Sequence, residues 1–148
     1  MDKQQAVKLA RERFERRIAE LEQHILTVQQ SANAESKSSM GDKYETGRAM
    51  AQNEVFMLRT QLENLRMELG KFEGADYSFR REECAAGSLV RTENGWFLLS
   101  AALGKVVVSG QPVMCISLDS PLGKALLGKR KEETFSVNGK EGSILEIS

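Results

Sequence analysis

The chain has 148 residues, a length typical of one compact domain or two small ones. Its 21 basic and 21 acidic side chains give a formal net charge of +0, which excludes a general electrostatic grip on nucleic acid or on an anionic membrane. Two cysteines and one histidine do not make a disulfide framework or a zinc site, so we predict two reduced, structural thiols.

The N-terminal segment MDKQQAVKLARERFERR is charged from its second residue onward. It lacks the apolar run of a signal peptide, and no later run approaches the ~20 apolar residues that span a bilayer. We therefore expect a cytoplasmic protein with no membrane partner.

Apolar residues recur at helical spacing in two stretches of the first half of the chain. The first seam consists of Val7, Phe14, Ile18, Leu21, Ile25 and Val28, and the second of Val55, Leu58, Leu62, Leu65, Leu69 and Phe72. Most steps are of three or four residues, which is typical of a coiled coil. Neither helix can bury its seam alone.

An antiparallel hairpin satisfies both seams within one chain. Its turn then falls near Met40 and Gly41, and Phe72 lies opposite Val7. At 1.5 Å per residue each arm would be on the order of 50 Å long. A parallel dimer of two copies is the alternative, but the polar stretch and Gly41 interrupt the periodicity and favour the hairpin. We therefore expect a monomer.

The helical period ends near residue 77, and short alternating or apolar runs follow. We predict strands over residues 88–92, 95–101, 105–109, 113–118, 134–137 and 143–147. The dipeptide Asn138-Gly139 favours a tight hairpin turn. The segment SPLGKALLGK predicts one short helix, with Ser120 as its N-cap and Pro121 in its first turn. The fold class is α+β, with a coiled-coil hairpin over residues 1–77 and a bent antiparallel sheet with one short helix over residues 78–148.

Two stretches carry more specific patterns. GDKYE at residues 41–45 lies at the predicted tip, within residues 40–47, and ISLDSPLGKALLGK at residues 116–129 contains the short helix. In this order the two stretches resemble signatures of the bacterial Gre transcript-cleavage factors. That family's tip motif is Gly-Asp, two variable residues and Glu. The resemblance implies an N-terminal antiparallel coiled coil and a C-terminal domain with an FKBP-like fold.

The resemblance also implies a function as a transcription elongation factor. Such a factor inserts its tip into the RNA polymerase secondary channel and stimulates Mg-dependent cleavage of backtracked RNA, so that the RNA 3′ end is an indirect partner. The factor is not itself an enzyme, because the endonuclease activity is that of the polymerase. Asp42 and Glu45 would complete the polymerase active site and share a Mg²⁺ ion that is bound only in that complex. The residues predicted to contact polymerase are Lys43, Tyr44, Arg48, Ser120 and Pro121.

Other interpretations of the same residues stay open. Asp42 and Glu45 are also close to a capping box for the second helix. Thr46 and Gly47 follow Glu45 where family members usually have Asn, which would permit a polymerase-binding inhibitor of the same architecture without cleavage stimulation. An FKBP-like isomerase or chaperone is a further alternative, although no isomerase pocket pattern is visible and a fold alone does not carry activity.

Overall fold

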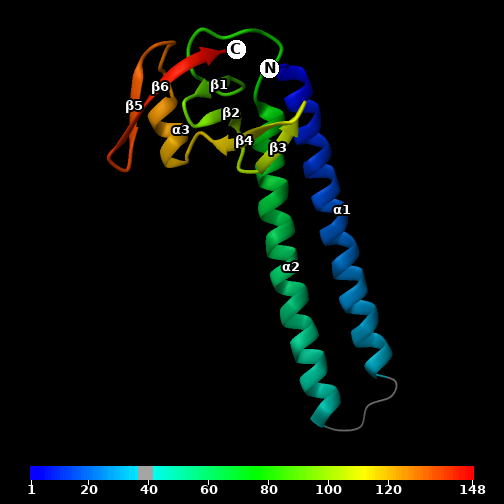
Figure 1. The fold of residues 1–148 in the computed structure, drawn as a ribbon. Helices are drawn as coiled ribbons and strands as arrows, with labels where there is room; N and C mark the ends of the chain where they lie inside the picture. Colours follow the sequence, from blue (N-terminus) through cyan, green and yellow to red (C-terminus); the bar gives the residue numbers. More distant parts are fainter. Residues whose placement is uncertain (37–41) are drawn as a thin grey trace. The chain divides into compact units, whose positions relative to one another are not determined.

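The computed structural model describes the backbone of residues 1–36 and 42–148 and the side chains of residues 1–33 and 45–148. Two long helices, α1 (Lys3–Ser36) and α2 (Asp42–Gly74), precede six strands and a short helix, α3 (Pro121–Leu126) (Figure 1). The α+β prediction is confirmed. The predicted turn at Met40 and Gly41 lies outside the described residues. Within the described segments, no helix is both long enough and apolar enough to cross a membrane.

The chain divides into two compact units. The first, here called the sheet unit, contains Met1–Phe14 and Glu68–Ser148. The second, here called the hairpin unit, contains Glu15–Met67. The first fourteen residues of the chain thus belong with its C-terminal half.

An apolar seam holds the hairpin unit together. Its buried residues are Ile25, Leu58 and Leu62, and Ile18, Leu21, Val28 and Val55 pack against them. All seven belong to the predicted seams. Polar contacts flank the seam, with Arg66 Nη2 2.8 Å from Glu22 Oε1 and His24 Nε2 3.5 Å from Glu54 Oε1. Residue numbers fall along α2 as they rise along α1, so the two helices are antiparallel, as predicted.

Aromatic rings fill the core where the helices enter the sheet unit. The Phe72 ring lies 5.4 Å from Phe14 and 5.2 Å from Tyr77, measured between centroids. Phe14 and Phe72 are both 0% exposed, and the Tyr77 hydroxyl donates to the Phe72 carbonyl at 2.7 Å. The predicted register placed Val7 opposite Phe72. In the structure Phe72 instead packs on Phe14, which is seven residues further along α1. Tyr77 contacts the same ring, so three aromatic side chains pack together at this end of the helices.

The six strands are β1 (Leu89–Thr92), β2 (Gly95–Ser100), β3 (Gly104–Val108), β4 (Gln111–Ser117), β5 (Thr134–Val137) and β6 (Lys140–Ile147). Their order in the sheet is β3-β4-β2-β1-β6-β5. The predicted antiparallel arrangement holds for every neighbouring pair except β2 and β4, which run parallel. The exception arises because the chain leaves β2 for the edge strand β3 and then returns to place β4 between them.

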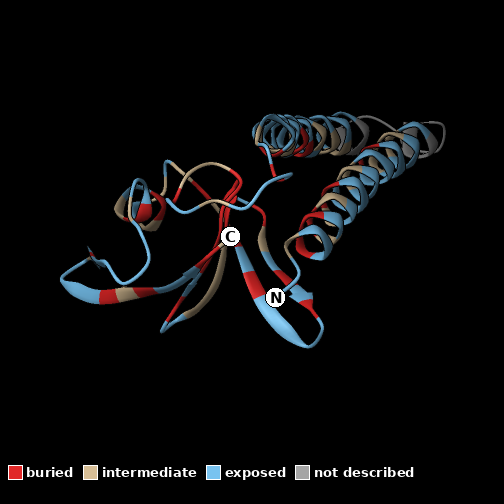
Figure 2. Cartoon of the chain, turned by 90° about the horizontal axis from the view of Figure 1, so that it is seen from above, coloured by how far each residue is buried: buried red, intermediate tan, exposed pale blue. Residues whose placement is uncertain are grey.

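Short turns and one helix complete the sheet. Asn138 and Gly139 have φ angles of 52° and 77°, which confirms the predicted hairpin turn, because a type I′ turn needs positive φ at both central residues. Helix α3 packs on the sheet through a core of Cys84, Val90, Leu99, Leu126, Phe135, Ile144 and Ile147. In Figure 2 buried residues gather in the strands and on one side of each helix.

Both cysteines are free and buried, as predicted for structural thiols. Burial raises the pKa of Cys84 to about 11 and that of Cys115 to about 12. The thiolate is the reactive form, so we expect the native chain to react slowly with a disulfide reagent at pH 8 and both thiols to react at once after unfolding. Rapid reaction of the native chain would contradict this prediction.

The same shift predicts a pH dependence of stability. Unfolded thiols ionise near pH 9, whereas the folded thiols stay protonated to pH 11–12. The unfolded chain therefore binds fewer protons in this window, and the free energy of unfolding falls as pH rises through it. Replacing both cysteines by alanine should flatten that fall, which denaturant titrations at pH 8 and pH 10 can measure.

Candidate functional site

The two predicted tip carboxylates belong to the first turn of α2. The helix begins at Asp42 and reaches Glu45 three residues later, a spacing at which helix positions are neighbours, about 5–6 Å apart between Cβ atoms. The Glu45 side chain is exposed. The side chains of Asp42, Lys43 and Tyr44 lie outside the described residues. The helix backbone thus brings the positions of the two predicted residues together.

Two carboxylates are a partial ligand set for Mg²⁺. Magnesium takes oxygen ligands, keeps several waters, and is commonly held by one or two carboxylates together with substrate phosphates. Asp42 and Glu45 fit this chemistry as contributors to a shared site. Among the side chains that the structure describes, no cluster of three or more acidic, histidine or cysteine residues could hold a metal. The remaining ligands would have to come from a partner.

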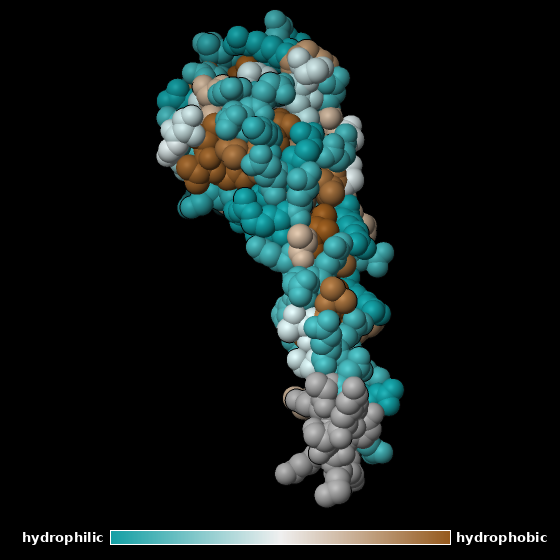
Figure 3. Space-filling view, turned by 90° about the vertical axis from the view of Figure 1, so that its right-hand side faces the viewer, coloured by the Kyte–Doolittle hydropathy of each residue, from teal (hydrophilic) through white to brown (hydrophobic). Residues whose placement is uncertain are grey.

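Arg48 lines an open groove in the hairpin unit. The groove has a volume of about 650 Å³, and its lining includes Arg48, Phe56 and Arg59 from α2 and Gln29 from α1. Phe56 is 72% exposed. On the face drawn in Figure 3, isolated apolar side chains interrupt a mainly hydrophilic helix surface. Arg48 itself is exposed, so its predicted contact with polymerase stays a prediction that the geometry permits.

The turn before α3 contains the other two predicted contact residues. Ser120 Oγ accepts a hydrogen bond from Gly123 N at 3.0 Å and donates to the Ser117 carbonyl at 2.7 Å. Ser120 is therefore the N-cap of α3, as predicted. Pro121 is the first helical residue and is exposed. A Cβ at Gly123 would overlap the Ser117 carbonyl oxygen, so the helix can start this close to β4 only with glycine there.

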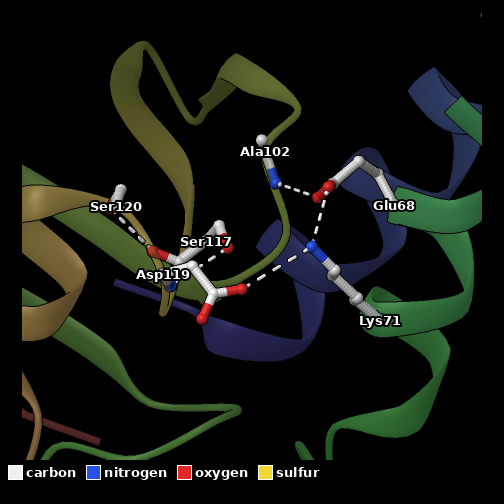
Figure 4. Close-up of polar contacts among 6 residues, drawn as sticks. All are labelled: Glu68, Lys71, Ala102, Ser117, Asp119 and Ser120. Carbon is white, nitrogen blue, oxygen red and sulfur yellow. Dashed lines mark hydrogen bonds and ion pairs between the residues drawn. The ribbon is translucent and has the colours of Figure 1, made fainter. Parts of the chain in front are cut away.

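A polar cluster connects α2 to this turn (Figure 4). Lys71 Nζ lies 3.0 Å from Glu68 Oε1 and 3.7 Å from Asp119 Oδ2. Glu68 Oε2 accepts a hydrogen bond from Ala102 N at 2.8 Å. The hydrogen bond to Glu68 raises the pKa of Lys71. The cluster thus ties the end of α2 to two loops of the sheet unit, while the Asp119 side chain remains 83% exposed beside the turn.

Sequence reasoning missed Phe56 and the polar cluster for different reasons. Phe56 directly follows the seam residue Val55, and adjacent helix positions do not share a face. Its exposure could therefore have been found from spacing alone. Lys71 and Asp119 are far apart in the sequence and meet only through the fold, so no local signal marks their contact.

Part of the chain matches the model of a known protein family. A family model described as "Transcription elongation factor, GreA/GreB, C-term" matches residues 108–148. These residues contain β4, α3, β5 and β6, including the Ser120–Pro121 turn. No curated protein matches the chain.

Two solved structures are similar to the chain over most of its length. One is the transcription factor Gfh1, with 22% identity and a TM-score of 0.37 over 95% of this chain and 94% of that chain. The other is the GreA factor homolog 1 (Gfh1) protein of Thermus thermophilus, with 20% identity and a TM-score of 0.37 over 93% of each chain. The match over residues 108–148 shows that this part of the chain is similar to the C-terminal domain of the GreA/GreB transcription elongation factors.

Proposed function

We propose that the chain inserts its hairpin tip into the secondary channel of RNA polymerase and stimulates Mg-dependent cleavage of backtracked RNA. The observation that carries the proposal is the position of Asp42 and Glu45 in the first turn of α2, in a chain whose residues 108–148 match the GreA/GreB C-terminal domain. The chain is not itself an enzyme in this proposal. Its tip completes a site whose catalytic centre belongs to the polymerase.

The two carboxylates share the same tasks in this mechanism. Asp42 and Glu45 orient the attacking water and accept hydrogen bonds from it, because an ionised carboxylate is only an acceptor. Either carboxylate can also take the proton of that water, directly or through a second water. A Mg²⁺ ion shared by Asp42 and Glu45 with the polymerase would lower the pKa of the attacking water and would stabilise negative charge on the phosphate oxygens. Cleavage leaves a new RNA 3′ end from which synthesis resumes.

Docking of the sheet unit would hold the factor on the polymerase. Pro121 is rigid and exposed at the first position of α3, which favours it as a contact residue. The Ser120 hydroxyl makes intramolecular hydrogen bonds. Ser120 would therefore contribute to docking by fixing the shape of the turn that presents Pro121. Lys43, Tyr44 and Arg48 are the proposed contacts near the tip.

One sequence feature favours a second candidate function. Thr46 and Gly47 follow the acidic pair, and α2 continues through both residues. Glycine lowers helix stability by ~1 kcal/mol relative to alanine, so the first turns of α2 are weaker than those of an all-alanine helix. A loosely held acidic pair would suit a polymerase-binding inhibitor that occupies the channel without cleaving RNA.

The test is an RNA cleavage assay on a stalled, backtracked elongation complex from the same organism in the presence of Mg²⁺. We expect the chain to shorten the RNA from its 3′ end by at least about tenfold faster than polymerase alone. A complex stalled without backtracking is the matched control, because it offers no extruded RNA to cleave. Binding without any shortening would replace the proposal by the inhibitor, and absence of binding would overturn both.

A further inference from the structure

A second concave site lies in the sheet unit. Its volume is about 400 Å³, and its lining includes Arg80, Arg81, Arg130 and Lys131. These four cations come from two loops, one between α2 and β1 and one between α3 and β5, and the end of β6 forms a third side. We refer to this site as the basic pocket.

Backbone hydrogen bonds hold the walls of the basic pocket in place. Cys84 N donates to the Lys129 carbonyl at 2.8 Å, and Gly128 N donates to the Cys84 carbonyl at 2.8 Å. Glu83 and Arg130 form an antiparallel bridge between the same two loops. In Figure 1 the loop after α2 passes close to the C-terminal end of the chain. The cations are therefore presented by a fixed framework.

The charges in the basic pocket are only partly compensated. Two carboxylates, Glu82 and Glu146, also line it. Glu146 already pairs with Arg91 at 3.3 Å, and Arg130 pairs with Glu83 at 3.5 Å. Over the described part of the chain, neither Arg80 nor Lys131 has an ion-pair partner within 4.0 Å. A chain with zero net charge thus carries a local positive surplus.

Arg81 makes two contacts within the sheet unit. Its guanidinium lies 4.4 Å from the centroid of the Phe79 ring, and its Nη2 donates to the Asp76 carbonyl at 3.3 Å. Its Nε is buried without a hydrogen-bond partner. Contacts within the sheet unit thus hold Arg81 at the wall of the basic pocket.

We propose that the basic pocket binds a compact polyphosphate group, either free or carried by a nucleotide. Guanidinium groups match phosphate oxygens through paired hydrogen bonds, and lysine adds a point charge. The volume lies within the range of small-molecule sites, and the charged lining disfavours an apolar ligand. Because the cations surround a concavity instead of forming an extended stripe, the pocket favours a compact anion over a nucleic-acid strand.

The test is calorimetric titration of the full chain with inorganic pyrophosphate at low salt, which requires no polymerase and is independent of the proposed function. We expect saturable binding that weakens about tenfold in the double variant Arg80→Gln and Lys131→Gln, since this variant removes two charged phosphate contacts from the pocket. The matched control is Lys105→Gln with Lys140→Gln, which removes the same charge from exposed positions of the same unit. That control should bind pyrophosphate within about twofold of the parent chain.

Three outcomes would overturn the proposal. One is the absence of saturable binding up to about 10 mM pyrophosphate, the weak limit of measurable affinity for a small ligand. Another is an equal loss of pyrophosphate affinity in both double variants, which would mean that the ligand is attracted by the overall positive charge of the unit and not by the basic pocket. The last is binding of a short single-stranded RNA through Arg80 and Lys131 without binding of pyrophosphate, which would assign the surface to a polymer. Tighter binding of a nucleoside diphosphate than of pyrophosphate would support the proposal and identify a nucleotide as the source of the phosphates.

Discussion

Replacing Glu45 by glutamine is expected to slow factor-dependent RNA cleavage by about a hundredfold or more, the range lost when an acid–base group is removed. Glutamine keeps the shape of the side chain and its exposed position on α2 but removes the negative charge. It can neither share Mg²⁺ as a carboxylate does nor accept a proton from water. Asp42→Asn should behave in the same way. The measurement is the rate of RNA shortening at saturating factor, with affinity for the polymerase determined separately by competition.

Glu63→Gln is the matched control for Glu45→Gln. Glu63 is also exposed on α2, so the chemical change is the same at a position away from the tip. Its cleavage rate should stay within about twofold of the parent chain, because isolated surface charges contribute little. Unchanged cleavage by both Glu45→Gln and Asp42→Asn would leave helix capping as the role of the acidic pair. A loss of affinity that matches the loss of cleavage would make these residues polymerase contacts only.

Phe72→Ala is expected to lower the free energy of unfolding by about 3–5 kcal/mol, the range for removing a buried aromatic ring. Phe72 is 0% exposed, and its ring contacts those of Phe14 and Tyr77. The Arg11 guanidinium also lies 5.5 Å from its centroid. Truncation would leave a cavity among these groups that a rigid sheet unit cannot fill. Denaturant unfolding followed by circular dichroism measures the change.

Phe56→Ala makes the same chemical change on the same helix at a position that is 72% exposed. Its effect on stability should remain within about 0.5 kcal/mol, as for most surface substitutions. If Phe56→Ala lowered the free energy of unfolding as much as Phe72→Ala, Phe56 would be buried in solution, for example against a second copy of the chain. Sedimentation of the parent chain would then show a dimer and contradict the expected monomer.

The sequence predicted those features that depend on short-range spacing. All seven residues of the apolar seam in the hairpin unit were predicted from helical periodicity. Ser120 and Pro121 begin α3 as expected, and Asn138-Gly139 forms the predicted turn. Local chemistry decides each of these features, since capping, a fixed proline φ and positive φ involve only a few neighbouring residues. The placement of positions 42 and 45 on one turn of α2 follows from the same kind of spacing.

Features that depend on distant contacts could not be predicted. The parallel pairing of β2 with β4 depends on where the β3–β4 hairpin docks, which strand propensities do not specify. Phe72 packs between Phe14 and Tyr77, and helical spacing alone does not include Tyr77, which lies beyond the end of α2. The four cations of the basic pocket look like ordinary surface charges in the sequence, where glutamates lie beside them. The two loops meet only in the fold, through the bridge between Glu83 and Arg130 and the backbone hydrogen bonds of Cys84.

The division of the chain also makes the arm length an adjustable property. Because the sheet unit is built from Met1–Phe14 and Glu68–Ser148, the hairpin unit is topologically an insertion within it. Deleting seven residues from each helix inside residues 15–67 would remove about two turns from each arm and keep the phase of the seam. The contacts of Phe14 and Phe72 would stay as they are. Paired heptad insertions or deletions thus offer a way for evolution or an engineer to reset the span of the arm without redesigning the sheet unit.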